Sequence, residues 1–333
     1  LIYVNVIAAM LFGAISGSAV AAASAIGGIL GPPMEKEKYS KEFGAAINVS
    51  ASTTGLIIPP SNVLIVYSLA SGGVSIASLF LAGYIPGILM GLALMLVAAV
   101  WIKKKKYPPG EKTSAKKIAT TFLDALPSLL LLVVVIGGIV SGIFTATEAS
   151  GIAVLYTLIL AIIYREINLN KLHKIFLSSV VTTSIVLLLI ATSMGMSWVM
   201  SFENIPQTVS DALLGLSDNK YVILIIINLL LLFVGTFMDM TPAILIFTPI
   251  FLPIMKSLGV DPVHFGMIMV MNLCVGLCTP PVGSVLFIGV GVAKTTIQKV
   301  MKPLLPLYIA MAIILLLVTY LPQISLWLPG LFE

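Results

Sequence analysis

The sequence predicts an all-α polytopic membrane protein in which two inverted repeats each carry a re-entrant helical hairpin and a broken transmembrane helix. Three observations predict this fold class. Of the 333 residues, 59% are hydrophobic and only 9% are charged, which excludes water as the main solvent of the chain. Apolar stretches long enough to cross a bilayer recur along the sequence. Matching Gly, Ser, Thr and Pro-Pro interruptions occur in two segments.

Seven apolar stretches are expected to form membrane-embedded helices, because a helix satisfies its backbone hydrogen bonds within its own segment. These stretches are Ile76–Ile102, Phe122–Gly142, Ile152–Tyr164, Phe176–Met200, Tyr221–Phe237, Ile244–Met255 and Leu304–Leu321.

The Lys and Arg residues divide unequally between the two sides of these stretches. Sixteen of the eighteen fall on one side and only Lys220 and Lys256 on the other, so the positive-inside rule makes the first side cytoplasmic. The run Lys103–Lys106 follows Trp101 at the end of an apolar stretch and lacks interleaved aromatic residues, so we expect no nucleic-acid binding. The sixteen are Lys36, Lys38, Lys41, Lys103, Lys104, Lys105, Lys106, Lys112, Lys116, Lys117, Arg165, Lys171, Lys174, Lys294, Lys299 and Lys302.

An internal repeat relates the two interrupted segments. Three markers recur in order with offsets of 222, 222 and 221 residues: Gly13 with Gly235, Phe43-Gly44 with Phe265-Gly266, and Pro59-Pro60 with Pro280-Pro281. The polar loop of the first unit, residues 35–42, falls on the cytoplasmic side, whereas that of the second, residues 257–264, falls outside. Each dipeptide alone could match by chance, but their order and the opposite topology indicate the inverted repeats of a secondary transporter.

The first two helices of each unit are expected to form a re-entrant hairpin. Residues 4–12 are too short to span, meet a break at residues 13–18 and return through Ala19–Leu30. In the second unit, Thr241 is the predicted N-cap of the returning half-helix, with Pro242 at its first position.

The breaks leave backbone groups unpaired in lipid, and bound ions or polar solutes would satisfy them. Carbonyl and hydroxyl oxygens at Ser16, Gly17 and Ser18, and again at residues 52–54, suit Na⁺, as do those at residues 236–241 and 277–279. Half-helix N-termini can hold an anion without an embedded cation.

Polar residues at the same depth are candidate solute contacts. Helix–helix hydrogen bonding is the alternative role for each of them, and a helix cap is the alternative for the carboxylate of Asp239. The candidates are Asn48, Ser50, Thr53, Asn62, Asp239 and Asn272, with Ser61 and Ser284 as further polar residues at that depth.

The sequence resembles the large membrane subunit of the tripartite ATP-independent periplasmic (TRAP) transporters. The resemblance rests on MLFGAISGSAVAAASAIGGILGPPM at Met10–Met34, SASTTGLIIPPS at Ser50–Ser61, FMDMTPAILIFTPIFLPI at Phe237–Ile254 and LCTPPVG at Leu277–Gly283. It implies a Na⁺-driven elevator importer in the bacterial inner membrane, working with a small membrane subunit and a periplasmic solute-binding protein. It also implies that the chain is the C-terminal portion of such a subunit, because the family has further N-terminal helices.

The family places its Na⁺ sites between hairpin tip and broken helix in each repeat. By resemblance, the Na⁺ ligands in this sequence are Ser16, Ser18, Ser52, Thr54, Thr236, Thr241 and Thr279, with Gly17 between the first two.

Four segments with distinct roles are expected. Residues 1–71 and 221–294 form the moving transport domain, residues 72–220 supply scaffold and arm helices with a basic loop at 103–117, and residues 295–333 form a C-terminal transmembrane helix. The expected solute is sialic acid, because SASTTG with Asn62 suits a polyhydroxylated acid and the likeness is to sialic-acid members; C4-dicarboxylate is second.

Two other functions are considered. One is a stand-alone ion-coupled dicarboxylate carrier that needs no binding protein. The other is a membrane-embedded enzyme, which is disfavoured because no Ser/His/Asp set, metal-spaced His cluster or paired carboxylates lie at a common depth.

Overall fold

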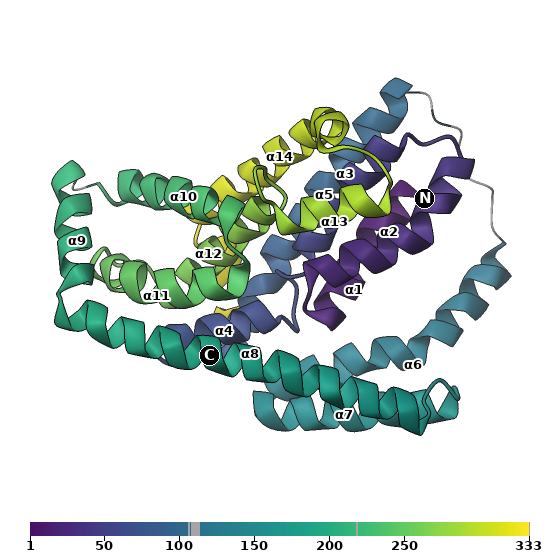
Figure 1. Cartoon of the computed structure of the whole chain (residues 1–333), viewed down its shortest axis with the longest axis horizontal. Helices are drawn as coiled ribbons and strands as arrows, with labels where there is room; N and C mark the ends of the chain where they lie inside the picture. Colours follow the sequence, from purple (N-terminus) through teal and green to yellow (C-terminus); the bar gives the residue numbers. More distant parts are fainter. Residues whose placement is uncertain (106, 108–113, 218, 333) are drawn as a thin grey trace. The chain divides into compact units, whose positions relative to one another are not determined.

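The secondary structure of the described residues is entirely helical, as the sequence predicted (Figure 1). The structure is a computed structural model that describes residues 1–105, 107, 114–217 and 219–332. Lys106 and Lys112, which belong to the predicted cytoplasmic set, lie outside the described residues.

Seven of the described helices are long and apolar enough to cross a membrane. Each overlaps one of the seven predicted stretches, so the prediction of a multi-pass membrane protein is confirmed. The spans are Ile76–Lys105, Ala119–Val140, Ala146–Ile163, Leu169–Phe202, Lys220–Phe237, Met240–Ser257 and Ile297–Tyr320.

The chain forms two compact units, one of Leu1–Pro109 with Gly195–Glu333 and one of Gly110–Met194. In the second unit α6 (Ala115–Val140) packs against α7 (Ala146–Ile163), and the first part of α8 (Leu169–Phe202) belongs to the same unit. All candidate residues lie in the first unit.

The first unit contains the two repeats, and the helix boundaries reproduce the predicted offset. The second, third and fifth helices of the two repeats begin 221 residues apart, at Ala19 and Met240, Lys41 and Pro262, and Ile76 and Ile297. The fifth pair extends the match beyond the markers seen in the sequence. The first repeat is α1 (Ile2–Ser16), α2 (Ala19–Lys36), α3 (Lys41–Thr54), α4 (Asn62–Ala70) and α5 (Ile76–Lys105). The second is α10 (Lys220–Phe237), α11 (Met240–Ser257), α12 (Pro262–Leu277), α13 (Ser284–Val292) and α14 (Ile297–Tyr320).

The two repeats are interlocked. In each, the first two helices form a hairpin, and the second arm packs on the short helix of the other repeat: α2 on α13 and α11 on α4 (Figure 1). The helices α3 and α12 form the core, because nearly all their residues are buried. They meet where the Thr53 hydroxyl lies 3.4 Å from the Cys278 sulfur. The shorter helices α9 (Ile205–Leu216), α15 (Gln323–Leu326) and η1 (Pro329–Leu331) complete the unit.

Two matched glycine pairs bring backbones into contact. A Cβ on Gly55, at the end of α3, would lie 2.6 Å from the Cα of Gly13 in α1. A Cβ on Gly276, in α12, would lie 2.5 Å from the carbonyl carbon of Gly235 in α10. Only glycine permits this approach, and Gly55 and Gly276 are themselves 221 residues apart.

The hairpin tips differ from the prediction in two details. α1 continues through Gly13 to Ser16, so the first break is confined to Gly17 (φ 63°) and Ser18. α11 begins at Met240 with Asp239 as its N-cap residue, so the prediction that Thr241 caps this helix is wrong. Pro242 did not fix the start because all N–H groups of a first helical turn lack helical partners, which makes proline tolerable throughout that turn.

Replacing Gly276 by alanine is expected to push α10 and α12 apart, because the new methyl group would overlap the backbone of Gly235. The cost should be about 1–3 kcal/mol, as for other overpacked sites, and should lower the thermal unfolding midpoint of the purified protein. The control is Gly291→Ala, at an exposed position of α13 with no atom within 4 Å of the added Cβ. Equal midpoints for the two variants would contradict the close approach.

Candidate functional site

The tip of the first hairpin lies beside the N-terminus of α4. A Cβ on Gly17 would lie 3.1 Å from Cγ of Asn62, the first residue of that helix. At the tip, the Ser16 hydroxyl donates to the Ser18 carbonyl at 3.3 Å, and the Ser18 hydroxyl accepts from the N–H of Ala21 at 3.2 Å. Ser18 is therefore the N-cap of α2. The predicted Na⁺ ligands of the tip and the predicted solute contact Asn62 are thus close together.

The second hairpin repeats this arrangement through its backbone. The N–H of Gly283, which is the N-cap residue of α13, donates to the carbonyl of Thr236 at 3.2 Å. Asp239 is exposed at the N-cap of α11, and Thr241 is in the first turn of the same helix. In both repeats, therefore, a hairpin tip meets the break between two half-helices.

Prolines at the breaks leave carbonyls that other groups must satisfy. Pro59 and Pro60 have no N–H and cannot donate to the carbonyls four residues earlier, as a helix would require. One of these, the carbonyl of Leu56, accepts a hydrogen bond from the Ser61 hydroxyl at 2.5 Å. In the second repeat, the Tyr308 hydroxyl of α14 donates to the carbonyl of Cys278, whose donor in a continuous helix would be Val282 rather than a proline. Both Pro-Pro bonds are cis.

Four of the seven predicted hydroxyl ligands donate a hydrogen bond to the carbonyl three or four residues earlier. The bonds run from Ser52 to Asn48 (2.7 Å), Thr54 to Ser50 (3.0 Å), Thr236 to Phe233 (2.7 Å) and Thr279 to Val275 (2.8 Å). A hydroxyl that donates a hydrogen bond still has two oxygen lone pairs, which can bind a cation. Ser52 and Thr54 are completely buried, whereas Thr236 and Thr279 are partly exposed.

The predicted solute contacts separate into exposed and buried groups. Asn62 and Asp239 are exposed at helix N-termini. The other four are buried and hydrogen-bonded within the protein. Ser50 donates to the Ala46 carbonyl, Thr53 to the Ser50 carbonyl and Asn48 to the Ala23 carbonyl, while Asn272 donates to the Asn228 side chain and the Ile268 carbonyl.

Asn272 belongs to a polar chain between helices. Asn228 of α10, which receives one of its hydrogens, donates in turn to the Thr319 hydroxyl of α14 at 3.1 Å. Both side-chain hydrogens of Asn272 are therefore used inside the helix packing, which favours the alternative of helix–helix hydrogen bonding.

Four helix N-termini lie at the two breaks, those of α2 and α4 in one repeat and of α11 and α13 in the other. The tip contacts bring the members of each pair together. Each N-terminus presents unpaired N–H groups and a positive dipole end, which favours anions. Residues 1–34, 43–71, 221–255 and 257–293 contain no Lys or Arg, so these N-termini are the positive groups of the breaks.

Ser284, a candidate solute contact from the sequence, has its hydroxyl buried in the first turn of α13 with no hydrogen-bond partner in the structure. Sequence reasoning missed two features of the site. Tyr308, which donates to a break carbonyl, is far away in sequence and carries no local signal. The partners Gly55 and Gly276 could have been found, because they recur with the repeat offset.

Comparison with known proteins places the chain in one family. Residues 1–324 match the family described as tripartite ATP-independent periplasmic transporter, DctM component. The chain is 60% identical to the uncharacterised protein YgiK of Salmonella typhimurium over 332 residues, covering all of this chain and 76% of that protein. It is 39% identical to the C4-dicarboxylate TRAP transporter large permease protein of Pseudomonas aeruginosa, covering 98% of this chain and 76% of the relative. It is 38% identical to the sialic acid TRAP transporter large permease protein of Vibrio cholerae, covering 99% and 77%.

These matches span about three quarters of each relative, so the expectation that the chain is only the C-terminal portion of a large subunit is corrected: it is most of one. They confirm the resemblance at the level of the family and exclude the enzyme alternative, whereas the sialic-acid subtype stays a prediction. The chain belongs to the DctM family of TRAP transporter large permeases and is a membrane transporter rather than an enzyme.

Proposed function

We propose that this protein imports an organic acid across the bacterial inner membrane, driven by Na⁺ through an elevator movement of residues 1–71 and 221–294. The observation that carries the proposal is the contact between hairpin tip and broken helix, which occurs once in each repeat. Such pairs of breaks are where secondary transporters bind solutes and coupling ions.

Oxygen-rich breaks support Na⁺ as the coupling ion. In the first repeat, the Ser52 and Thr54 hydroxyls donate hydrogen bonds to carbonyls, and their oxygen lone pairs remain available to a cation. In the second, Thr236 and Thr279 do the same, and the Asp239 carboxylate lies at the adjoining N-cap. We assign one Na⁺ to each break, with Ser16, Gly17, Ser18 and Thr241 as further ligands.

Paired helix N-termini support an acidic solute between the two ion sites. Relatives named for C4-dicarboxylate and for sialic acid are almost equally similar to the chain, so identity does not rank these solutes. Sialic acid stays our first candidate and C4-dicarboxylate the second. The support is Asn62, whose amide is exposed beside Gly17 and can bind a hydroxyl or acetamido group.

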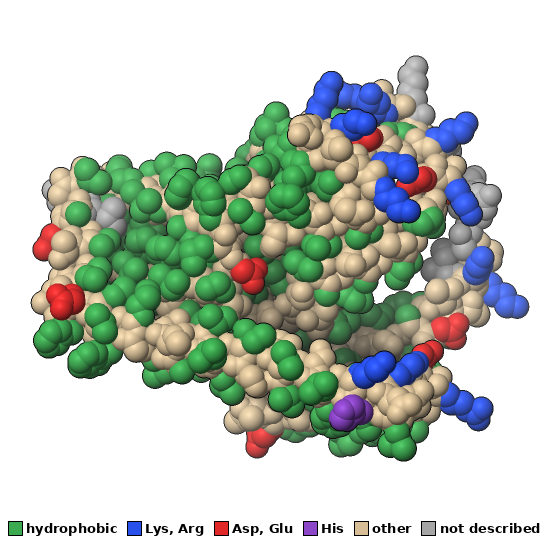
Figure 2. All heavy atoms as spheres, viewed as in Figure 1, with side chains coloured by type: hydrophobic (Ala, Val, Ile, Leu, Met, Phe, Trp, Pro, Cys, Tyr) green, Lys and Arg blue, Asp and Glu red, His purple; other side chains and the backbone are tan. Residues whose placement is uncertain are grey.

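Membership of the family supports a small membrane subunit and a periplasmic solute-binding protein as partners. The side with most Lys and Arg would face the cytoplasm. In the first unit, the helix ends at Lys36, Lys41 and Lys105 carry lysines, and Figure 2 shows basic side chains gathered at one end of that unit. A stand-alone carrier is the alternative.

Replacing Thr54 or Thr279 by valine removes an oxygen ligand with little change in side-chain shape. We expect the Na⁺ concentration for half-maximal uptake to rise about tenfold in each variant, equivalent to losing ~1.4 kcal/mol of ion binding. Uptake by proteoliposomes over a range of Na⁺ concentrations measures this.

The matched control for these variants is Thr248→Val. Thr248 is as buried as Thr54 and lies in the middle of α11, where its hydroxyl contacts the Met269 sulfur at 3.3 Å and no break is present. Its Na⁺ dependence should stay unchanged. If Thr54→Val and Thr279→Val both keep the original Na⁺ affinity, neither residue is an ion ligand.

Asn62→Ala should mainly affect solute binding, whereas Asn272→Ala should mainly affect stability. Asn62 is exposed at the tip, so its loss should weaken solute binding about tenfold with little change in stability. Asn272 is buried, so its loss should leave the Asn228 oxygen without a donor and cost about 1–3 kcal/mol of stability.

Solute affinity and the thermal midpoint of the purified transporter distinguish these roles. A stable Asn272→Ala protein that has lost solute binding would show instead that Asn272 contacts the solute. An Asn62→Ala protein with normal affinity would remove Asn62 from the solute site.

Dependence on a binding protein separates the tripartite transporter from the stand-alone carrier. We expect proteoliposomes that contain this chain with its small subunit to accumulate solute only when the loaded periplasmic protein is added. Parallel assays with sialic acid and with succinate rank the two solutes. Rapid Na⁺-driven uptake without the periplasmic protein would rule out the tripartite transporter in favour of the stand-alone carrier.

A further inference from the structure

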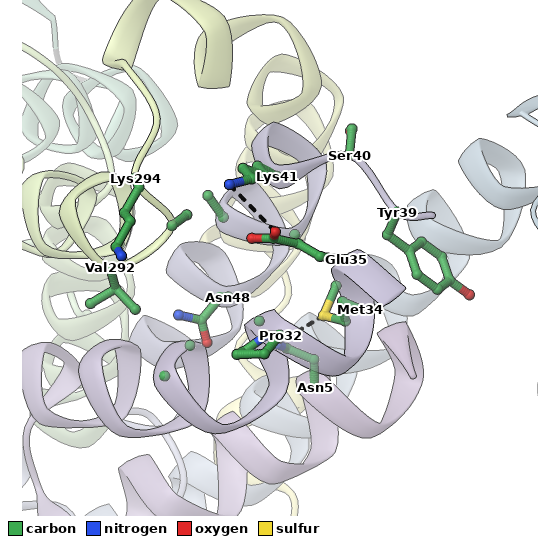
Figure 3. Close-up of a pocket in the computed structure, with 17 residues that line it drawn as sticks. Asn5, Pro32, Met34, Glu35, Tyr39, Ser40, Lys41, Asn48, Val292 and Lys294 are labelled. Atoms are coloured by element: carbon green, nitrogen blue, oxygen red, sulfur yellow. Dashed lines mark hydrogen bonds and ion pairs between the residues drawn. The ribbon is translucent and has the colours of Figure 1, made fainter. Parts of the chain in front are cut away.

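A separate cavity of about 310 Å³ lies in the first unit between α2, α3 and the end of α13 (Figure 3). This volume is at the lower end of the range of small-molecule sites. Its lining includes Asn5, Gly28, Glu35, Asn48 and Lys294. The lysines at the ends of these helices place the cavity on the side predicted to be cytoplasmic, away from the N-termini of the half-helices.

Unpaired hydrogen-bond acceptors line this cavity. Asn48 is 3% exposed and donates through Nδ2 to the Ala23 carbonyl at 2.7 Å, which leaves its Oδ1 without a partner in the structure. Asn5 is 1% exposed, and its Oδ1 also lacks a partner while Nδ2 contacts the Met34 sulfur at 3.8 Å.

The backbone of α2 adds to this demand for donors. Pro32 has no N–H and cannot donate to the carbonyl of Gly28, four residues earlier, and both residues line the cavity. A buried acceptor without a donor costs roughly 1–3 kcal/mol, so Oδ1 of Asn48 and of Asn5 favour a ligand that carries O–H or N–H groups, while the carbonyl of the exposed Gly28 is a further acceptor.

The mouth of the cavity carries charge. Glu35 and Lys41 form an ion pair at 3.4 Å, so their charges largely offset each other (Figure 3). Lys294 is exposed, lines the same cavity and takes part in neither of the ion pairs found among the described residues. The net positive charge at the mouth favours a carboxylate and disfavours a metal cation.

We propose that this cavity is a second solute site, on the cytoplasmic side, for a small hydroxylated carboxylate. The carboxylate pairs with Lys294, and ligand hydroxyls donate to Oδ1 of Asn48 and of Asn5. The proposal rests on the proposed function for its ligand class, but the site contains none of the Na⁺ ligands and binds without Na⁺. Its walls come from both repeats, so a bound ligand connects the first hairpin to α13.

Equilibrium dialysis of radiolabelled gluconate against the purified transporter complex, in choline buffer without Na⁺, tests the site. Lys294→Asn removes the charge, and Gly28→Leu adds a side chain at a lining position where an added Cβ meets no atom within 4 Å. Each should weaken gluconate binding about tenfold. Propionate, which has a carboxylate but no hydroxyl, should compete about tenfold more weakly than unlabelled gluconate.

Two control variants have the same local backbone conformation as the two test variants. Lys38 has φ 66° and Lys294 has φ 50°, and asparagine tolerates this left-handed region, so Lys38→Asn changes an equivalent surface lysine that does not line the cavity. Gly291→Leu adds the same bulk at another open helical glycine. Both should bind gluconate normally.

Equal losses in Lys38→Asn and Lys294→Asn would overturn the proposal, because they would show general attraction to a basic surface. Competition by NaCl but not by choline chloride would overturn it in favour of a cation site. If Na⁺-driven uptake fails while Na⁺-free gluconate binding remains sensitive to Lys294, the proposed function fails and this site stands. If uptake is normal but gluconate binding does not change in Lys294→Asn and Gly28→Leu, the cavity is not a solute site and the proposed function stands.

Discussion

The backbone contact between the first helix of each repeat and the end of its third helix fixes the position of the hairpin tips. There is no room for a Cβ atom at Gly13, Gly55 or Gly276, and at Gly235 a Cβ would lie only 3.1 Å from the Cα of Gly276. In a membrane this proximity has a chemical consequence, because backbone groups at a break cannot turn to water. The tip must lie within hydrogen-bonding distance of the break, as the bond from Gly283 to Thr236 shows.

The two repeats share this constraint but satisfy it with different groups. In the first, a break carbonyl is bound locally by the Ser61 hydroxyl, whereas in the second Tyr308 reaches the Cys278 carbonyl from α14. The residue equivalent to Tyr308, 221 positions earlier, is Gly87, where a Cβ would overlap the Ile58 side chain. The first break is therefore enclosed by close packing against α5, whereas the second is held by the hydrogen bond from the Tyr308 hydroxyl. Thr236 and Thr279 in the second repeat are also more exposed than Ser52 and Thr54 in the first.

The spans and the repeat could be predicted because both depend on residues near each other in the sequence or on a constant offset. Apolar length alone located all seven spans. The start of α11 could not be located from Thr241 and Pro242, because a first helical turn accepts proline at several positions. The partners of Asn272 and the donor to Cys278 lie 44 and 30 residues away, and no local pattern encodes such pairs. The cavity could not be predicted from the sequence, because its lining residues Asn48 and Lys294 come from different repeats and meet only in the folded chain.

Asn48 and Asn272 show why a buried amide in a membrane protein does not by itself indicate a ligand. Both lie on core helices, α3 and α12, and both are almost inaccessible. Asn272 uses its two hydrogens to join α12 to α10 and to its own helix, so its main effect is on packing. Asn48 uses Nδ2 to hold α2 and leaves Oδ1 facing a cavity that is large enough for a solute. Oδ1 is unpaired in both amides, so the difference is that Asn48 lines this cavity and Asn272 does not, and an unpaired oxygen requires a ligand that can donate a hydrogen bond.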